Sequence, residues 1–262
     1  MKYRILGTLE VRRDGVGLHL GGSRRRALLA ALLVKSGRVA TTDYLARAVW
    51  EQPPRSMHAN LRTHLAALRR VLAGPGDDHG IVSHPDGYQL LVSADQFDLA
   101  VFEALRERGR RAEQQGFLDL AARQYASALA LWRGDVLDGV RGGGPALLGE
   151  AAAVEERRLA TVERWVEVRL AQGACADAVE ELYRLVAAYP LREVFWGQLM
   201  RGLHAAGRRA EALGAYQRAR AHCVEELGVE PGQALRGLHG RILDGVACAE
   251  PVRVGCGAPT GW

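Results

Sequence analysis

The second half of the chain contains a repeated pattern that restricts its fold to stacked helix pairs. Gly173 and Gly207 lie 34 residues apart, which is the period of tetratricopeptide helix pairs. In each copy an alanine follows the glycine by five residues, and a larger side chain follows the alanine by four. Small residues let two helices approach closely, and larger ones fill the groove between them. A third copy begins at Gly116, and the repeated positions are Ala121, Ala178 and Ala212, then Tyr125, Leu182 and Tyr216, then Ala128, Leu185 and Ala219.

From Asp98 onward the hydrophobic pattern is helical almost without interruption. It predicts an all-α, tetratricopeptide-like helical-repeat domain over residues 96–246. Pro190 falls where such a repeat ends its second helix. Helix-pair arrays of this kind are scaffolds without chemistry of their own. Residues 247–262 are rich in Gly and Pro with no period, and we expect them to form a flexible tail.

Residues 1–95 have the element order of a small α+β domain. Alternating segments around RRDG predict a β-hairpin. Ser23 is expected to cap a helix that Gly37 ends, and Thr42 to cap a second one. The two prolines of EQPPRS interrupt this pattern, and Ser56 caps a third helix that Gly74-Pro75 ends. IVSHPDGYQLLV then predicts a second hairpin.

The positive charge of the chain is confined to this first domain. Residues 1–95 hold 14 Lys and Arg against 8 Asp and Glu, whereas residues 96–262 hold 21 against 22. A basic domain joined to a nearly neutral one indicates an anionic polymer as partner of the first. Because nearly all the cations are arginine and Ala, Gly and Val are abundant, a GC-rich genome is an alternative cause of the arginine content.

Other classes of protein are not indicated by the sequence. No apolar run is long enough for a membrane span, and charges interrupt the apolar start of the chain, so we expect a cytoplasmic protein without membrane contact. Phosphate-binding, zinc-protease and serine-hydrolase motifs do not occur, so we expect neither an enzyme nor a cofactor. The four cysteines are scattered at spacings that suit no metal, and are expected to be free thiols.

The third helix of the first domain, residues 56–72, has two distinct faces. At 100° per residue, its leucines fall in a stripe about 60° wide that would face the core. No acidic residue occurs in the segment. Arg, Asn, Thr and Ala can all contact base edges in a major groove, so we predict a reading face there, although a basic amphipathic helix that only packs is the alternative. The predicted reading residues are Asn60, Arg62, Thr63, Ala66 and Arg70.

Further cations and a hairpin extend the predicted DNA-binding surface. Arg24, Arg25 and Arg26 lie in the first turn of their helix, where free amides and guanidiniums suit a phosphate, unless the side chains are simply solvated. Arg69 either meets a phosphate or complements the helix dipole. His84 and Tyr88 flank the second hairpin, which could act as a wing on DNA, with Tyr88 alternatively a core residue.

Several motifs in order resemble one known family. GGSRRRALLAALL, AVWEQPP, ANLRTHLAALRRVL and HPDGYQLLV resemble a winged helix-turn-helix of the OmpR/PhoB type. ALALWRGDVLDG and EELGVEPG, with the repeats, resemble a bacterial transcriptional activation domain. The combination is similar to the Streptomyces antibiotic regulatory protein family over about residues 2–246.

The resemblance implies a DNA-binding transcriptional activator of a secondary-metabolite (antibiotic) gene cluster. Such a protein would bind direct repeats in double-stranded DNA side by side as a homodimer, and recruit RNA polymerase holoenzyme through its sigma factor. It would lie with the nucleoid in the cytoplasm. The resemblance places the five reading residues in the major groove, the four other arginines on phosphates, and His84 in the wing. It places Glu51, Gln52 and Arg55 against the polymerase.

Two other functions remain open at this stage. The helical array could bind peptides as an adaptor, with the basic domain as an incidental anion binder. The same fold could also repress transcription, because the sign depends on where the DNA site lies relative to the promoter.

Overall fold

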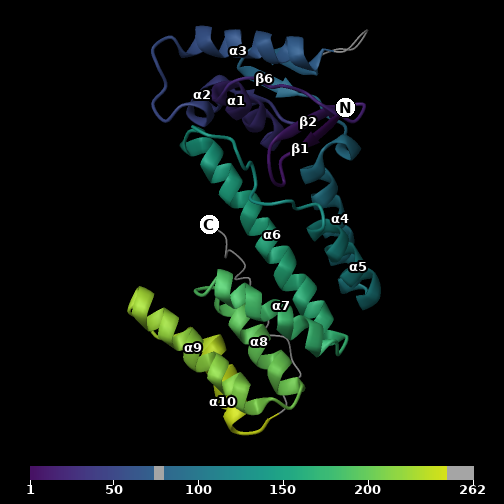
Figure 1. Ribbon diagram of the computed structural model, residues 1–262, viewed down its shortest axis with the longest axis vertical. Helices are drawn as coiled ribbons and strands as arrows, with labels where there is room; N and C mark the ends of the chain where they lie inside the picture. Colours follow the sequence, from purple (N-terminus) through teal and green to yellow (C-terminus); the bar gives the residue numbers. More distant parts are fainter. Residues whose placement is uncertain (74–79, 247–262) are drawn as a thin grey trace, which may run out of the picture. The chain divides into compact units, whose positions relative to one another are not determined.

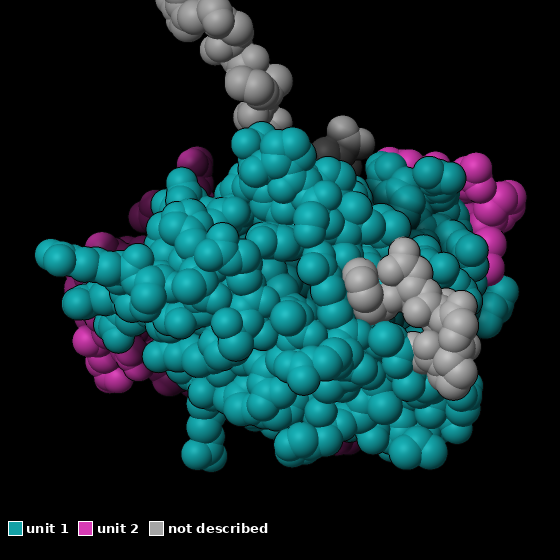
Figure 2. Space-filling model, turned by 90° about the horizontal axis from the view of Figure 1, so that it is seen from above, with its two compact units in different colours: residues 1–112, 123–161 teal, residues 113–122, 162–262 magenta. Residues whose placement is uncertain are grey.

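The computed structural model describes residues 1–73 and 80–246; the predictions for Gly74-Pro75 and for the tail lie outside these residues. The chain packs into two compact units, residues 1–112 with 123–161 and residues 113–122 with 162–262, which Figure 2 distinguishes by colour. These units do not follow the expected boundary between residues 95 and 96, which stays a prediction about domain organisation.

The first unit begins with a three-stranded antiparallel sheet in the order β1-β2-β3. The expected first strand is two strands, because the chain turns back between Arg4 and Glu10. Asp14 and Gly15 both have positive φ, 48° and 85°, which is the backbone of a tight two-residue hairpin turn. The strands are β1 (Lys2–Arg4), β2 (Glu10–Arg13) and β3 (Val16–Gly17).

A winged helix-turn-helix follows this sheet (Figure 1). A short strand that the sequence analysis did not predict, β4, pairs with β6, so the second sheet has the order β4-β6-β5 rather than a lone hairpin. The elements are α1 (Ser23–Val34), β4 (Ala40–Thr41), α2 (Thr42–Val49), α3 (Met57–Leu72), β5 (Ile81–His84) and β6 (Gly87–Leu90).

The expected helix caps are partly wrong. The cap of α1 is Gly22 and not Ser23, because Gly21 turns with φ +82° and Gly22 is already extended. The cap of α2 is Thr41, whose hydroxyl accepts from the Tyr44 amide at 3.2 Å. Thr41 is the last extended residue before α2 because it belongs to β4, and an extended residue there is what an N-cap requires. Ser56 precedes α3 as expected, but its side chain does not bond to the helix amides.

The described residues after Asp98 are mostly helical, as the repeat predicts. Gly116, Gly173 and Gly207 each follow a helix with φ between 74° and 79°, so each ends the first helix of a pair. All the repeated alanine, tyrosine and leucine positions are buried, from 0% to 8% exposed, which confirms their packing role. A 3-10 turn, η1 (Ala94–Gln96), precedes the helices α4 (Asp98–Gln114), α5 (Leu118–Leu129), α6 (Pro145–Ala171), α7 (Cys175–Ala188), α8 (Glu193–Ala205), α9 (Arg209–Leu227) and α10 (Gln233–Leu243).

One hydrophobic core in the first unit joins the winged helix to the first helices of the helical region. Ile5 and Leu6, fully buried, belong to the same cluster as Phe102 of α4, Leu137 before α6 and Val154 of α6. The buried faces of α1, α2 and α3 belong to it as well. The winged helix and the first helical pair therefore do not have separate interiors.

Polar contacts accompany this shared core. The Asp98 carboxylate, at the start of α4, accepts the backbone amides of Ile5 at 2.9 Å and Leu6 at 3.1 Å. The Leu137 amide donates back to the Ile5 carbonyl at 2.9 Å, and the Gly144 amide donates to the Ala48 carbonyl of α2 at 2.8 Å. Backbone groups that would otherwise be unpaired at the junction thus find partners.

Substitution of Gly144 tests this junction. A Cβ there would lie 2.2 Å from the Arg47 carbonyl oxygen and 2.3 Å from that of Trp50, so the end of α2 must shift. We expect Gly144→Ala to destabilise the first unit by about 2–3 kcal/mol, seen as a fall of several degrees in its thermal unfolding midpoint. Gly149→Ala is the matched control, because its Cβ meets nothing within 4 Å. Equal midpoints for the two variants would contradict the close contact.

Candidate nucleic-acid interface

Helix α3 is held by its leucines and presents its opposite side to solvent. Leu61, Leu65, Leu68 and Leu72 are at most 1% exposed, as the angular spacing predicts. Four of the five predicted reading residues are exposed and Asn60 is half-buried. Since no acidic residue occurs on α3 or its cap, this face is cationic and free of carboxylates. The exposed reading residues are Arg62, Thr63, Ala66 and Arg70.

The polar side chains of this face bond only locally. The Thr63 hydroxyl donates to the Ala59 carbonyl at 3.0 Å, and the Asn60 amide to the Ser56 hydroxyl at 3.2 Å. Arg70 makes a long contact of 3.5 Å with the Ala66 carbonyl. In the described part of the chain, none of them pairs with a carboxylate. Guanidinium and amide donors on this side of α3 are therefore available to a ligand.

Arg69 lies on the flank of α3 and braces the second hairpin. Its guanidinium donates to the Ser83 hydroxyl at 2.8 Å and to the Ile81 carbonyl at 3.2 Å, both on β5. The side chain was expected to meet a phosphate or the helix dipole. Its principal contacts are instead with the hairpin, and a phosphate contact through the remaining donors stays a prediction.

Arg13, on β2, closes the C-terminal end of α3. Its guanidinium donates to the carbonyls of Leu72 at 2.9 Å and of Val71 and Ala73 at 3.2 Å. The last carbonyls of a helix have no partner within the helix, and a cation there also complements the dipole. This role of Arg13 could not be predicted from the sequence, because no spacing rule connects residue 13 with residue 72.

The three arginines that begin α1 have different surroundings. Arg24 donates to the Val49 carbonyl at the end of α2 and to the Gly142 carbonyl at 2.9 Å. Arg26 makes a long contact of 3.4 Å with the Leu9 carbonyl. Arg25 lies over the Gly21 backbone, where a Cβ would come within 2.2 Å of its guanidinium. All three are half-buried, and a role in holding phosphates stays a prediction for each.

His64 faces the inner flank of α3. Its ring lies 6.4 Å from that of Trp50. Burial lowers the pKa of His64, and the nearby charges of Arg25 and Arg24 lower it further. The imidazole is therefore kept neutral at neutral pH, as suits a packing residue beside two cations.

The second hairpin, the expected wing, is partly a structural element. Tyr88 pairs with Ala40 of β4, and its partly buried side chain packs against the core, which supports the structural role; a contact of its ring with DNA stays a prediction. His84 lies 3.0 Å from the Gln89 side chain, and its contact with DNA stays a prediction. The loop before α3 exposes Glu51, Gln52 and Arg55.

Other site types find no support in the described residues. Within residues 1–73 and 80–246 there is no group of three or more His, Cys, Asp or Glu side chains that could hold a metal ion. Cys175 and Cys223 are free thiols. Within the same ranges no helix is both long and apolar enough to cross a membrane.

Comparison with known proteins agrees with this architecture. Residues 18–90 match the family described as transcriptional regulatory protein, C terminal, and residues 97–243 match the bacterial transcriptional activator domain. DnrI of Streptomyces peucetius, a regulatory protein, is 35% identical over 93% of this chain and 92% of its own length. The chain belongs to the Streptomyces antibiotic regulatory protein family. Its members in these comparisons are transcriptional regulators and not enzymes, and the expected fold class, a winged helix before a helical-repeat domain, is confirmed.

Two further relatives show how widely this pair of domains is shared. The transcriptional regulatory protein MoaR1 of Mycobacterium tuberculosis is 37% identical over 93% of this chain and 79% of its own length. The solved structure of Mycobacterium tuberculosis EmbR with a low-affinity phosphopeptide superposes with a TM-score of 0.87 at 32% identity. That match covers 94% of this chain but only 65% of EmbR.

Substitution of the arginines around α3 distinguishes bracing from exposed side chains. We expect Arg69→Met and Arg13→Met each to destabilise the first unit by about 1–3 kcal/mol, because each removes charged hydrogen bonds to backbone carbonyls. The matched control Arg62→Met should stay within about 0.5 kcal/mol, as is usual for an exposed position. Thermal unfolding of the full chain measures all three. Similar midpoints for Arg69→Met and Arg62→Met would show that the contacts with β5 do not stabilise the hairpin.

Proposed function

We propose that this regulator is a sequence-specific transcriptional activator of a secondary-metabolite (antibiotic) gene cluster. In this proposal two copies bind direct repeats in double-stranded DNA, with α3 in the major groove, and recruit RNA polymerase holoenzyme through its sigma factor. The protein then acts on the nucleoid in the cytoplasm.

The exposed face of α3 is the single observation that supports DNA reading most directly. It presents Arg62 and Arg70 with Thr63 and Ala66 between them, without a carboxylate. The arginines can bond guanine in a bidentate manner, while the methyl groups of Thr63 and Ala66 suit thymine. Small side chains in the middle of the face allow the helix to approach the bases closely.

The neighbouring elements suit a supporting role in the same complex. Arg24, Arg25, Arg26 and Arg69 would neutralise phosphates with the donors left over from their contacts within the protein. His84 would lie in the wing beside the backbone, next to Tyr88. The exposed loop with Glu51, Gln52 and Arg55 would meet the polymerase, since it lies beside α3 without being part of its reading face.

Binding of the full chain to DNA selected from a random library tests the reading face. We expect Arg70→Ala and Arg62→Ala each to cost about 1–3 kcal/mol on the selected sequence and much less on unrelated DNA. Arg25→Ala should weaken both kinds of DNA nearly equally and lower the salt dependence by about one released counterion. Titrations at several salt concentrations measure these effects.

Arg111→Ala is the control for this experiment. Arg111 is 69% exposed on α4 and pairs with Glu107, so its loss should leave DNA binding unchanged. An affinity for the selected DNA that does not change with salt concentration would refute the proposal. If the wild-type chain selected no DNA sequence but captured a peptide, the adaptor function would hold instead.

The loop between α2 and α3 is tested by transcription in vitro. The triple variant Glu51→Ala, Gln52→Ala, Arg55→Ala should bind its DNA site as tightly as wild type, because none of these residues lies on the reading face of α3. We expect its stimulation of transcription by purified RNA polymerase holoenzyme to fall by about tenfold, which corresponds to the loss of about 1.4 kcal/mol of recruitment. Unchanged stimulation would place the polymerase contact elsewhere, and inhibition of transcription by the wild type would identify a repressor.

A further inference from the structure

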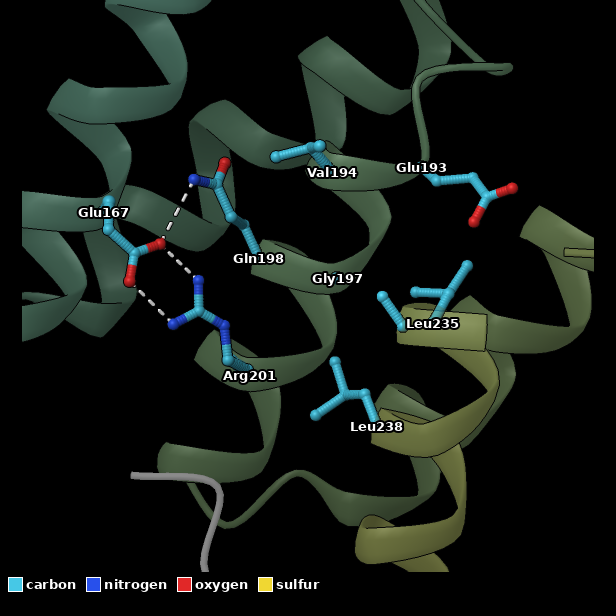
Figure 3. Close-up of a pocket in the computed structure, with 9 residues that line it drawn as sticks. Glu167, Glu193, Val194, Gly197, Gln198, Arg201, Leu235 and Leu238 are labelled. Carbon is cyan, nitrogen blue, oxygen red and sulfur yellow. Dashed lines mark hydrogen bonds and ion pairs between the residues drawn. The ribbon is translucent and has the colours of Figure 1, made fainter. Parts of the chain in front are cut away.

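A cavity in the second unit lies between α8 and α10, with α6 beside it (Figure 3). Its volume is about 240 Å³. Val194 of α8 and Leu235 and Leu238 of α10 provide apolar walls, and Gly197 leaves the middle of α8 without a side chain. A cavity of roughly 150 Å³ lined by apolar side chains is enough to bind benzene. The space in this unit therefore suits an apolar body of about two fused rings.

The carboxylate on the α6 side of the cavity, that of Glu167, already has its partners. The Arg201 guanidinium makes a two-pronged contact with it, with one N–O distance of 2.8 Å. The Gln198 amide nitrogen lies 3.4 Å from the same carboxylate. Since the Arg201 and Glu167 side chains are only 11% and 20% exposed, the pair is largely shielded from water. This wall therefore adds no net charge to the lining.

A second carboxylate, that of Glu193 at the start of α8, leaves the lining with a negative charge. Its two oxygens lie 2.9 Å from the amide nitrogen of Gly232, the cap residue of α10. The start of a helix carries about half a positive charge, so it offsets only part of the charge of the carboxylate. One N–H also leaves most acceptor positions of a carboxylate open. In the described part of the chain, no Lys, Arg or His side chain pairs with Glu193.

This carboxylate lies where the cavity meets solvent. Glu193 is half-buried, and the next residue, Val194, is 38% exposed although it lines the cavity. Figure 3 shows Glu193 on the same side of the cavity as Leu235, away from Glu167. A cation that pairs at such a place keeps part of its hydration, so it avoids most of the desolvation penalty of a fully buried ion pair.

We propose that this cavity is a binding site for a small organic cation, which has an apolar body of about two fused rings and one amine on a short arm. The rings lie between Leu235 and Leu238 of α10 and the gap at Gly197, and the ammonium group pairs with the Glu193 carboxylate. This site is on the helical array and does not depend on the DNA-binding function proposed for α3.

Gly197 gives control over the space for the rings. A Cβ at this position would lie 3.7 Å from a Leu235 methyl carbon and 3.9 Å from one of Leu238, which are ordinary van der Waals distances. Alanine therefore fits without displacing α10, and leucine would occupy the space of the ligand. Gly214 of α9, where a Cβ meets nothing within 4 Å, is the matched control.

Glu193 gives separate control over the charge. In Glu193→Gln the side-chain oxygen can still accept from the Gly232 amide, so the cap of α10 is kept and only the negative charge is lost. Glu226→Gln is the matched control, because this exposed carboxylate on α9 does not line the cavity.

The test is a titration of the full chain, with labelled leucine methyl groups, by tryptamine, 3-propylindole and indole-3-propionate. The three probes share the indole body and the length of the arm, which ends in an ammonium, a methyl or a carboxylate group. We expect saturable shifts of the Leu235 and Leu238 methyl resonances with tryptamine. Binding of 3-propylindole should be about tenfold weaker for the loss of a charged hydrogen bond, and that of indole-3-propionate weaker still.

The variants separate the two parts of the site. Glu193→Gln should bind tryptamine and 3-propylindole with equal affinity, whereas Glu226→Gln should keep the tenfold preference. In the wild type, added salt should narrow the preference, because the ion pair is partly exposed. Gly197→Leu should abolish the shifts with every probe, Gly197→Ala should weaken tryptamine binding, and Gly214→Ala should change nothing.

Several results would overturn the proposal. They are the absence of saturable shifts at Leu235 and Leu238, equal affinity of the wild type for tryptamine and 3-propylindole, and a tenfold preference that survives in Glu193→Gln. Tryptamine binding that survives in a folded Gly197→Leu variant would do the same.

Two further measurements cover variants that do not fold, as judged by circular dichroism. Undiminished tryptamine binding to Gly197→Ala would then replace the result for Gly197→Leu, and a preference of the wild type that does not change with salt would replace the result for Glu193→Gln. Tighter binding of a peptide with adjacent lysine and tryptophan than of tryptamine would assign the cavity to a protein partner and would overturn the small-molecule site.

Discussion

The structure of the first unit depends on one hydrophobic core that crosses the boundary between two sequence families. Ile5 and Leu6, which precede the winged helix, are buried together with Phe102, Leu137 and Val154 of the activator region. The hydrophobic effect does not follow family boundaries; it favours whatever apolar area is removed from water. The orientation of α3 within this unit therefore depends on residues up to about ninety positions further along the chain.

Backbone carbonyls at helix ends account for the different roles of the arginines. The ends of α2 and α3 leave carbonyls without partners inside the helix, and each finds an arginine from elsewhere in the chain. Arg24 reaches Val49, and Arg13 reaches Leu72. Arg62 and Arg70 lie on the outer side of α3, Arg70 in its last turn, and both remain exposed. Arg69 and Arg70 share the last turn of α3, so the face of the helix, and not the distance from its end, separates the bracing arginine from the one that can meet a ligand.

Much of the fold could be predicted from the sequence because it is encoded in local periodicity. The leucine spacing identified the buried side of α3, and the glycine-alanine-tyrosine repeat identified the helix pairs. Both patterns depend only on helix geometry, which is the same in every protein. Strand β4 has two residues, Ala40 and Thr41, and could not be predicted, because so short a strand exists only through its pairing with β6. The N-cap of α2 was misplaced by one residue for the same reason.

The candidate site was predictable only in part, since a helical wheel shows which residues leave the core but not what they meet. It placed Thr63, Ala66 and Arg70 outward correctly. It could not show that Arg69, one position away, reaches Ser83, because that contact depends on how the hairpin packs on α3. Charge counts say even less about which cations are free to bind DNA. They count Arg13, which bonds to the end of α3, and Arg62, which is exposed, as equivalent.

The shared core also decides which fragment of this regulator can serve as its DNA-binding part. A chain cut after residue 95 would expose Ile5 and Leu6 and leave their amides without the Asp98 carboxylate. It would also lose the Gly144 amide that pairs with the Ala48 carbonyl at the end of α2. Buried amides without partners and newly exposed leucine and isoleucine both favour the unfolded state. Weak DNA binding by such a fragment would therefore reflect the missing half of its core, and only the intact chain can report on the reading face of α3.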